Sequence, residues 1–95
     1  PAEIESVLSL HPAVKEVAVA GLMDERLGQV VTAFVVTSTN KEISAEMLDR
    51  WCLDSDLADF KRPRRYIFIR EIPKSPVGKI LRRQLVEGDY NRAAS

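Results

Sequence analysis

The chain of 95 residues contains a single cysteine, Cys52, and a single histidine, His11. One cysteine excludes an internal disulfide framework and fits a reducing compartment, so we expect a cytoplasmic location. One histidine and one cysteine are too few for a zinc site of the usual kind, so we expect no metal site in this chain. No apolar run approaches the roughly 20 residues that cross a membrane, and no signal peptide is visible, so we expect no membrane span.

Basic residues are scarce in the first 60 residues and acidic residues are scarce in the last 35, although the formal net charge is zero. Residues 1–60 contain four Lys and Arg against eleven Asp and Glu, whereas residues 61–95 contain ten against three. Such segregation produces a local field even at zero net charge. A solvated basic surface is the common explanation of a basic run. Here loops with Gly and Pro interrupt the run, which favours an anion-binding site.

The spacing of apolar residues predicts an α+β fold, a small sheet of about three strands with helices packed on it. The expected strands cover residues 14–22, 29–37 and 66–70. The first two strands are joined by a short turn, so they should pair as antiparallel neighbours. The continuous apolar run within residues 30–36 indicates that the second strand is buried on both faces.

Two helices are expected to pack on this sheet before the third strand. The first begins at Pro1, because proline is favoured at the first helical position, and ends at His11, because a proline follows it. Ser44 is the expected N-cap of the second helix. This helix carries Trp51 and Cys52 on one face, and we interpret both as core residues.

The two ends of the chain lead to different expectations about structure. The chain lacks an initiator methionine and enters a helix at once, so we expect a fragment whose upstream part is absent. Near the other end, a short basic helix is expected over residues 79–85. Residues 88–95 are expected to form a frayed tail, because the ends of domains are poorly ordered unless they are tied down.

The candidate catalytic residue is Lys79, in the loop formed by residues 73–79 (PKSPVGK). Two prolines restrict the backbone, and Gly78 permits geometries that other residues resist, so the lysine stands on a partly preorganised tip. Ionised lysine is a compact charge with three donors, suited to phosphate or carboxylate oxygens. The loop is not a P-loop, because that motif needs Gly at position 73 and Ser or Thr at position 80.

A second candidate site is the basic run at residues 60–65 (FKRPRR). Arg62 and Arg64 flank Pro63, and guanidinium groups can hold a phosphate through two parallel hydrogen bonds. Phe60 has two readings, stacking on a base or packing in the core, and the core is the more common one. A stand-alone nucleic-acid-binding module is another alternative, but the aromatic residues are not interleaved with the basic ones as a stacking platform requires.

Several motifs follow one another in a characteristic order. They are residues 1–5 (PAEIE), 11–14 (HPAV), 17–21 (VAVAG), 60–63 (FKRP) and 73–83 (PKSPVGKILRR), with Asp24 and Gly28 between them. This order resembles the small C-terminal domain of adenylate-forming enzymes, the superfamily of acyl- and aryl-CoA ligases, peptide-synthetase adenylation domains and luciferases. Residues 57–63 (LADFKRP) are most similar to bacterial aryl-CoA ligases related to chlorobenzoate-CoA ligase.

The resemblance implies two half-reactions. Such enzymes join a carboxylic acid to ATP, giving an acyl-adenylate and pyrophosphate, and a thiol such as CoA then displaces AMP. Lys79 matches the lysine that bridges the substrate carboxylate and the α-phosphate region during adenylation. The domain then rotates for thioester formation. In that state Gly21 lines the pantetheine tunnel, and Phe60, Arg62 and Arg64 lie near the CoA nucleotide.

The resemblance also implies what lies outside this chain. Residues 1–87 would be a mobile lid on a large N-terminal domain that is absent here and that holds ATP and Mg²⁺. The isolated lid is therefore expected to be inactive, with no nucleic acid among its partners. Leu27 departs from the similar ligases, because an aromatic residue that contacts CoA can stand there. An adenylation domain that loads a carrier protein would use the same lysine and stays open as an alternative.

Overall fold

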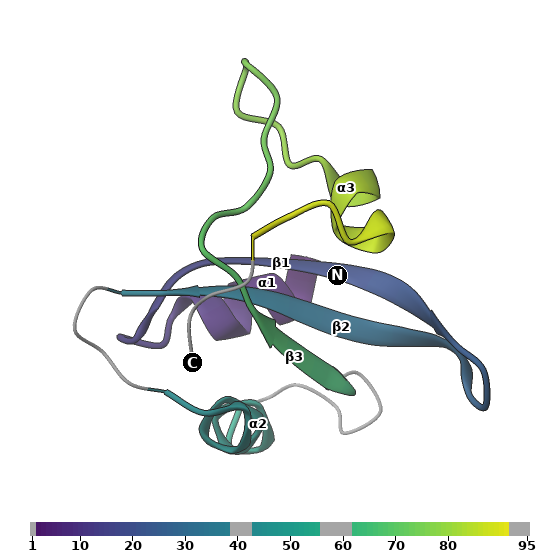
Figure 1. Cartoon of the computed structure of the whole chain (residues 1–95). Helices are drawn as coiled ribbons and strands as arrows, with labels where there is room; N and C mark the ends of the chain where they lie inside the picture. Colours follow the sequence, from purple (N-terminus) through teal and green to yellow (C-terminus); the bar gives the residue numbers. More distant parts are fainter. Residues whose placement is uncertain (1, 39–42, 56–61, 92–95) are drawn as a thin grey trace.

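The computed structural model describes residues 2–38, 43–55 and 62–91. Within these residues the elements along the chain are α1 (Ala2–Ser9), β1 (Val14–Asp24), β2 (Gly28–Thr37), α2 (Ala45–Leu53), β3 (Arg65–Phe68) and α3 (Arg82–Glu87). The result is the expected α+β fold, a three-stranded sheet with helices packed on it (Figure 1). No helix in the described part of the chain is long and apolar enough to cross a membrane.

The sheet has the strand order β1-β2-β3, which makes β2 the central strand and leaves β1 at an edge. β1 and β2 form the expected antiparallel pair, in register down to Asp24 opposite Gly28 beside the turn. β3 pairs in parallel with the other side of β2. A parallel neighbour needs a crossover connection, and the segment that contains α2 provides it.

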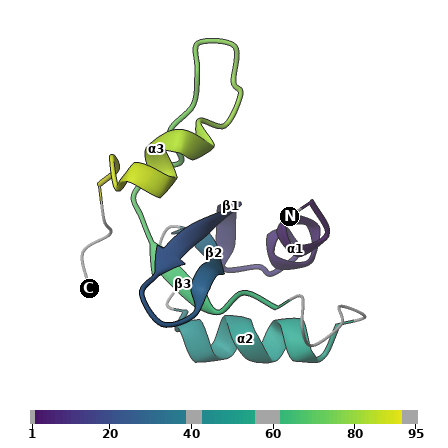
Figure 2. The ribbon, with the colours of Figure 1, turned by 90° about the vertical axis from the view of Figure 1, so that its right-hand side faces the viewer.

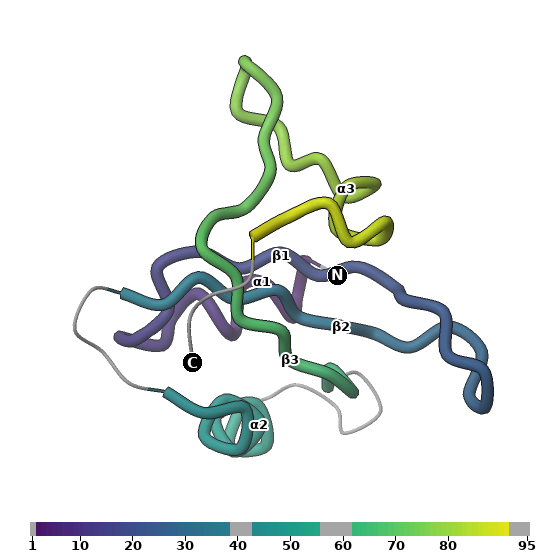
Figure 3. Tube along the Cα trace, in the orientation of Figure 1, coloured from purple at the N-terminus to yellow at the C-terminus, as the bar shows by residue number. Residues whose placement is uncertain are grey.

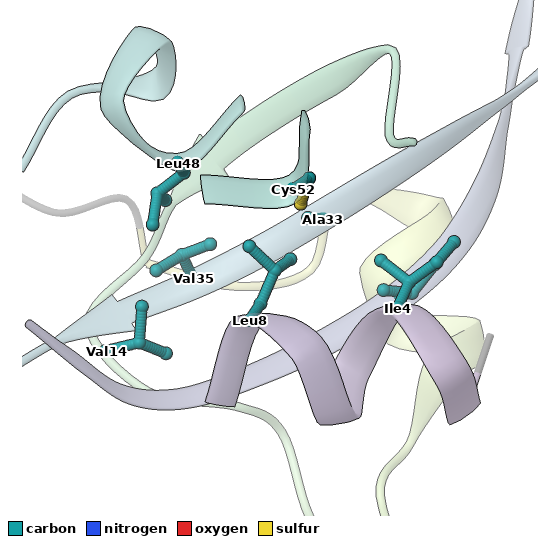
Figure 4. Close-up of a cluster of buried hydrophobic side chains, with 8 residues drawn as sticks. Ile4, Leu8, Val14, Ala33, Val35, Leu48 and Cys52 are labelled. Atoms are coloured by element: carbon teal, nitrogen blue, oxygen red, sulfur yellow. The ribbon is translucent and has the colours of Figure 1, made fainter. Parts of the chain in front are cut away.

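Helices α1 and α2 cover one face of the sheet. Their apolar side chains point toward the strands, as the close-up in Figure 4 shows for Ile4, Leu8 and Leu48. The buried residues of this cluster are Ile4, Leu8, Val14, Val19, Ala33, Val35, Leu48 and Cys52. Trp51 packs against the same cluster, and its indole N–H donates to the carbonyl of Val7 at 2.7 Å. The sequence-based assignment of Trp51 and Cys52 to the core is confirmed.

The opposite face of the sheet is covered by α3 and the segments around it, as the side view in Figure 2 shows. The buried residues of this second cluster are Ala18, Ala20, Phe34, Val36, Ile69, Ile72 and Leu85. β2 contributes to both clusters, because successive side chains of a strand point to opposite faces. This confirms the expectation that the central strand is buried on both sides.

The last helix begins at Arg82 and not at the expected Lys79. Lys79 and Ile80 instead form the returning limb of a hairpin. Lys74 pairs with Ile80 across this hairpin, and the carbonyl of Lys79 accepts a hydrogen bond from the N–H of Ser75 at 2.8 Å. Backbone groups that bond across a hairpin are not available to a helix, so the expected start was wrong.

The N-cap of α2 is confirmed, because the Ser44 hydroxyl accepts a hydrogen bond from the N–H of Met47 at 3.2 Å. The segment after α3 returns to the sheet. Tyr90 packs edge-on against Phe34, with ring centroids 5.4 Å apart, and the carbonyl of Asn91 accepts a hydrogen bond from Arg70. The expected tail therefore starts with packed residues. Residues 92–95 lie outside the described part, where fraying stays a prediction.

Candidate functional site

Lys79 stands on a hairpin of residues 73–81 that projects from the α3 side of the sheet (Figure 1 and Figure 3). The hydroxyl of Ser75 accepts a hydrogen bond from the N–H of Lys79 at 3.2 Å, and the carbonyl of Ser75 accepts one from Gly78 at 2.9 Å. Gly78 has a φ of 83°, in the left-handed region that glycine adopts without steric penalty. These contacts fix the backbone at Lys79 while its side chain stays exposed.

The base of this hairpin is fastened to the sheet on its ascending limb. The N–H of Leu81 donates to the carbonyl of Pro73 at 2.9 Å and closes the base. The ammonium group of Lys74 forms an ion pair with Glu16 of β1 at 2.7 Å. Ile72, just before the hairpin, is buried in the core cluster under α3. The ascending limb is therefore held by one apolar contact and one ion pair.

The descending limb leads into Arg82, whose guanidinium group reaches the free edge of β1. Its Nε donates to the carbonyl of Val19 at 3.2 Å, and its Nη2 pairs with Oε2 of Glu5 at 2.8 Å. The same Glu5 oxygen accepts a hydrogen bond from the N–H of Val19 at 2.8 Å. Arg83, next along α3, is largely exposed, and its ion pair within the described residues is a long one with Glu87. We call the three residues Glu5, Val19 and Arg82 the edge clamp.

On the other side of the sheet, Arg62 is held by an acid of α2. Its Nη1 pairs with Oδ2 of Asp49 at 2.5 Å, and Oδ1 of Asp49 accepts a hydrogen bond from the Tyr66 hydroxyl at 3.2 Å. Burial, followed by contacts with Cys52 and Asp49, raises the pKa of Tyr66 far above its usual range, so the hydroxyl is a permanent donor. The Nε of Arg62 is buried and has no partner among the described residues.

A surface pocket of about 460 Å³ adjoins this arginine. Its lining residues are Ala45, Glu46, Asp49, Arg62, Pro63, Arg64 and Tyr66. Arg64 is exposed, and its backbone N–H donates to the carbonyl of Val31 at 2.8 Å, which places it at the start of β3. The structure thus places Arg62 and Arg64 in the lining of one pocket. Phe60, expected beside them, lies outside the described residues.

Gly21 lies on β1 opposite Val31 of β2. Because the carbonyl of Val31 accepts a hydrogen bond from Arg64 on the β3 side, the polar groups of Val31 face away from β1. Gly21 and Val31 are therefore a non-hydrogen-bonded pair, and the N–H and C=O of Gly21 face the free edge of the sheet. The side chain of Gln29 covers this glycine, since a Cβ added there would lie 2.7 Å from its Cδ.

The predicted site residues fall on two sides of the sheet. Gly21 follows Val19 by two residues on β1 and therefore shares its face of the sheet, the face covered by α1 and α2. The pocket of Arg62 lies on that same side. The Lys79 hairpin rises from the cluster under α3. The structure therefore does not bring all candidates together. It separates Lys79 from the other described candidates by the thickness of the sheet.

Several of the charges that are segregated along the sequence meet in ion pairs in the fold. Four ion pairs join a cation from residues 62–82 to an acid from the first 60 residues: Arg62 to Asp49, Arg65 to Asp24, Lys74 to Glu16 and Arg82 to Glu5. Among the described residues, Lys79 and Arg64 take no part in such a pair. These four cations are held by acids of the same chain, which makes them less available to nucleic-acid phosphates, the groups that Lys and Arg neutralise in such complexes.

The described residues do not provide a site for Mg²⁺. Within residues 2–38, 43–55 and 62–91, no group of three or more His, Cys, Asp or Glu side chains is placed to hold a metal ion. Carboxylate oxygens are the protein ligands that Mg²⁺ prefers. The donor set of the described residues does not fit the metal.

Sequence reasoning missed three polar residues that shape the two sites. Glu5 binds the arginine after the Lys79 hairpin, Asp49 holds Arg62, and Gln29 covers Gly21. Glu5 stands within the PAEIE motif, so its position offered a signal, but nothing identified its partner 77 residues away. Asp49 and Gln29 offered no signal, because an acid on a helix and an amide in a strand are ordinary surface residues.

Comparison with known proteins identifies relatives over most of the chain. The profile of the family described as AMP-binding enzyme C-terminal domain matches residues 3–79. The 4-chlorobenzoate–CoA ligase of Pseudomonas sp. (strain CBS-3) is 54% identical over 87 residues, which make up 92% of this chain and 16% of that protein. The fatty acid–[acyl-carrier-protein] ligase ScoC of Streptomyces coeruleorubidus is 51% identical over 85 residues, 90% of this chain and 16% of that ligase.

A solved structure gives the same result. A fatty acyl CoA synthetase of Mycobacterium tuberculosis matches with a TM-score of 0.85 and 45% identity, over 93% of this chain and 17% of that one. The chain therefore spans only 16% to 17% of the length of these relatives. Fold, motif order and family profile agree, and the chain belongs to the family of C-terminal domains of AMP-binding enzymes.

Proposed function

We propose that this chain is the mobile C-terminal lid of an ATP-dependent, AMP-forming acyl- or aryl-CoA ligase. Relatives named as CoA ligases match it over most of its length, with identities of 45% to 54%. The observation that supports the proposal most is the position of Lys79, exposed on the returning limb of a hydrogen-bonded hairpin and without an ion-pair partner among the described residues. A lysine in this position can enter the active site of a second domain.

In the proposed adenylation step, Lys79 places its ammonium group between the substrate carboxylate and the α-phosphate of ATP. The lysine makes no covalent bond and moves no proton. It stabilises negative charge as the carboxylate attacks phosphorus and pyrophosphate leaves. One preorganised electrostatic contact of this kind is worth about 3–4 kcal/mol, or a factor of 10² to 10³ in rate.

In the proposed thioester step, the lid presents the side of the sheet that carries Gly21, Arg62 and Arg64. The outward N–H and C=O of Gly21 can pair with an amide of the pantetheine arm, as the free edge of a strand pairs with an extended ligand. The pocket beside Arg62 and Arg64 offers two guanidinium groups to the CoA phosphates. Phe60, outside the described residues, is proposed to lie near the CoA nucleotide.

The separation of these residues supports a rotation between the steps. A rigid lid cannot point both sides of its sheet at one active site, so it must turn between the half-reactions. The large N-terminal domain is the proposed partner in both states and the proposed holder of ATP and Mg²⁺. We also propose a cytoplasmic location, where ATP and CoA are available.

A carrier protein is the alternative acceptor. The support for it is the identity of 51% to a ligase named for an acyl-carrier protein. Both acceptors end in the same kind of thiol arm, so the candidate site at Gly21 serves either one. Assays of the complete enzyme with CoA and with a thiol-loaded carrier protein distinguish the two, because only the true acceptor is consumed stoichiometrically with AMP release.

The test of the proposal is the variant Lys79→Ala in the complete enzyme. We expect acyl-adenylate formation, measured as pyrophosphate release in single turnover, to fall by about 10² to 10³. Thioester formation from a chemically prepared acyl-adenylate should stay within a few-fold of the parent enzyme. Adenylation that remains close to the parent rate would show that Lys79 is not the adenylation lysine.

A further inference from the structure

The edge clamp connects three elements that are far apart in the sequence. Glu5 belongs to α1, Val19 to β1, and Arg82 to the first turn of α3. One oxygen of Glu5 receives two hydrogen bonds, from the N–H of Val19 and from Nη2 of Arg82, both at 2.8 Å. Arg82 returns to the same residue of β1 through its Nε, 3.2 Å from the carbonyl of Val19.

The clamp differs from an ordinary surface ion pair. The side chain of Glu5 is only 20% exposed, and the two partners also satisfy both backbone groups of Val19 at an otherwise free sheet edge. Exposed pairs contribute little, because solvent and salt weaken them. Arg83 provides the comparison on the same helix, since its pair with Glu87 is long, at 3.9 Å, and the arginine is 91% exposed.

The clamp lies at the base of the Lys79 hairpin. Arg82 follows Lys79 by three residues, and Leu81 between them closes the hairpin against Pro73. The descending limb from Lys79 enters α3 at Arg82, so the clamp fixes the direction in which this limb leaves the sheet. On the ascending limb the corresponding anchor is the pair of Lys74 with Glu16.

We propose that Glu5 and Arg82 are positioning residues for Lys79: the edge clamp holds the base of the hairpin so that the ammonium group reaches the reacting atoms during adenylation. This inference rests on the proposed function of Lys79. A displacement of about 1 Å at a reacting group can cost about 10²-fold in rate. β1 itself is fixed by its register with β2, so Gly21 keeps its place when the clamp is lost.

The experiment uses single-turnover assays of both half-reactions in the complete enzyme, with the variants Glu5→Gln, Arg82→Gln and their combination. We expect adenylation to fall about 10-fold in each single variant, with little change in the KM for ATP. The double variant should fall no further than either single one, because the two residues act as a unit. Thioester formation from prepared acyl-adenylate should stay within about 2-fold and shows that each variant is folded.

Two controls separate this inference from the proposed function. Arg83→Gln removes a neighbouring arginine that, within the described part of the chain, makes no hydrogen bond or ion pair to β1, so adenylation should be unchanged. Lys79→Ala tests the proposed function itself. If Lys79→Ala abolishes adenylation while Glu5→Gln does not slow it, the positioning role is wrong and the function of Lys79 stands. Equal losses in both half-reactions would also overturn the inference, because they indicate a general loss of structure.

Discussion

At the scale of single residues, Gly21 is a position where an added side chain would meet a neighbour. A methyl group at this position would lie 2.7 Å to 2.8 Å from side-chain atoms of Gln29. Gln29 is exposed and its side chain is flexible, so the fold can accommodate the methyl group by moving the amide away. A ligand bound along the free edge of β1 cannot move aside as the Gln29 side chain can. The cost of a substitution at Gly21 should therefore appear in binding and hardly in stability.

This predicts the behaviour of Gly21→Ala in the complete enzyme. The free energy of unfolding should change by less than about 1 kcal/mol, as for surface substitutions without a buried contact. The KM for CoA in the thioester step should rise about 10-fold, measured by steady-state kinetics with prepared acyl-adenylate, while adenylation stays unchanged. An unaltered KM for CoA would remove Gly21 from the proposed thiol site.

The variant Gln29→Ala supplies the matched control. Alone, it uncovers Gly21 and should leave the KM for CoA within about 2-fold of the parent. Combined with Gly21→Ala, it removes the clash between the methyl group and the amide. Persistence of the defect in the double variant assigns the effect to the methyl group itself. Recovery of the parent KM assigns it to the displaced amide of Gln29.

At the scale of elements, the Lys79 hairpin shows how local chemistry fixes a loop. Gly78 at a φ of 83° turns the chain, and Ser75 binds both Gly78 and Lys79. An L-residue in the left-handed region costs about 1–2 kcal/mol. A cost of this size can displace the local equilibrium of a loop that has few other contacts.

Substitution of this glycine should therefore act on the geometry of the hairpin. In the complete enzyme, Gly78→Ala is expected to slow single-turnover adenylation by about 5-fold to 30-fold, the factor that 1–2 kcal/mol represents. Thioester formation should be unaffected, because the hairpin is on the other side of the sheet from Gly21 and Arg62. An adenylation rate equal to that of the parent would mean that the hairpin tolerates the strained turn.

The elements also show what sequence reasoning can reach. Helix α2 was predictable, because the cap at Ser44 and the apolar face with Leu48 and Cys52 are local signals. The start of α3 was not, since residues 79–81 form a basic and apolar stretch that suits a helix. The hydrogen bonds between Lys79 and Ser75 across the hairpin are what prevent this stretch from being helical.

In the candidate sites, too, some features have local sequence signals and others depend on contacts between distant residues. Lys79 and the Arg62 cluster carry recognisable motifs, and the structure places Arg62 and Arg64 at one pocket. The residues that hold them, Glu5 and Asp49, lie 77 and 13 positions away from the arginines they bind. Such partners are set by the packing of elements in three dimensions, and periodicity along one chain does not contain that information.

At the scale of the whole molecule, the sheet acts as a partition between two sites. Lys79 rises from the α3 side, whereas Arg62 lies on the side of α1 and α2. Substitutions at sites that share no partners are expected to act independently. The two half-reactions should therefore respond to different residues of this small domain.

This independence can be measured with Lys79→Ala, Arg62→Ala and the double variant. Lys79→Ala should reduce only adenylation, and Arg62→Ala should raise only the KM for CoA, by about 10-fold. The double variant should show both defects, each with its single-variant magnitude, in assays of the separate half-reactions. Coupling larger than about 0.5 kcal/mol between the two sites would contradict the partition.

The ion pairs across the sequence have a consequence for biosynthesis. The first 60 residues leave the ribosome with a net charge of −7, and the pairs to Asp24, Glu16 and Glu5 span 41, 58 and 77 residues. At about 5–20 residues per second, the last 35 residues take roughly 2–7 s to follow. β3 follows early in that time, but the nascent acidic segment has no α3 to pack against until near its end. The domain can close only when the final third of the chain has been synthesised.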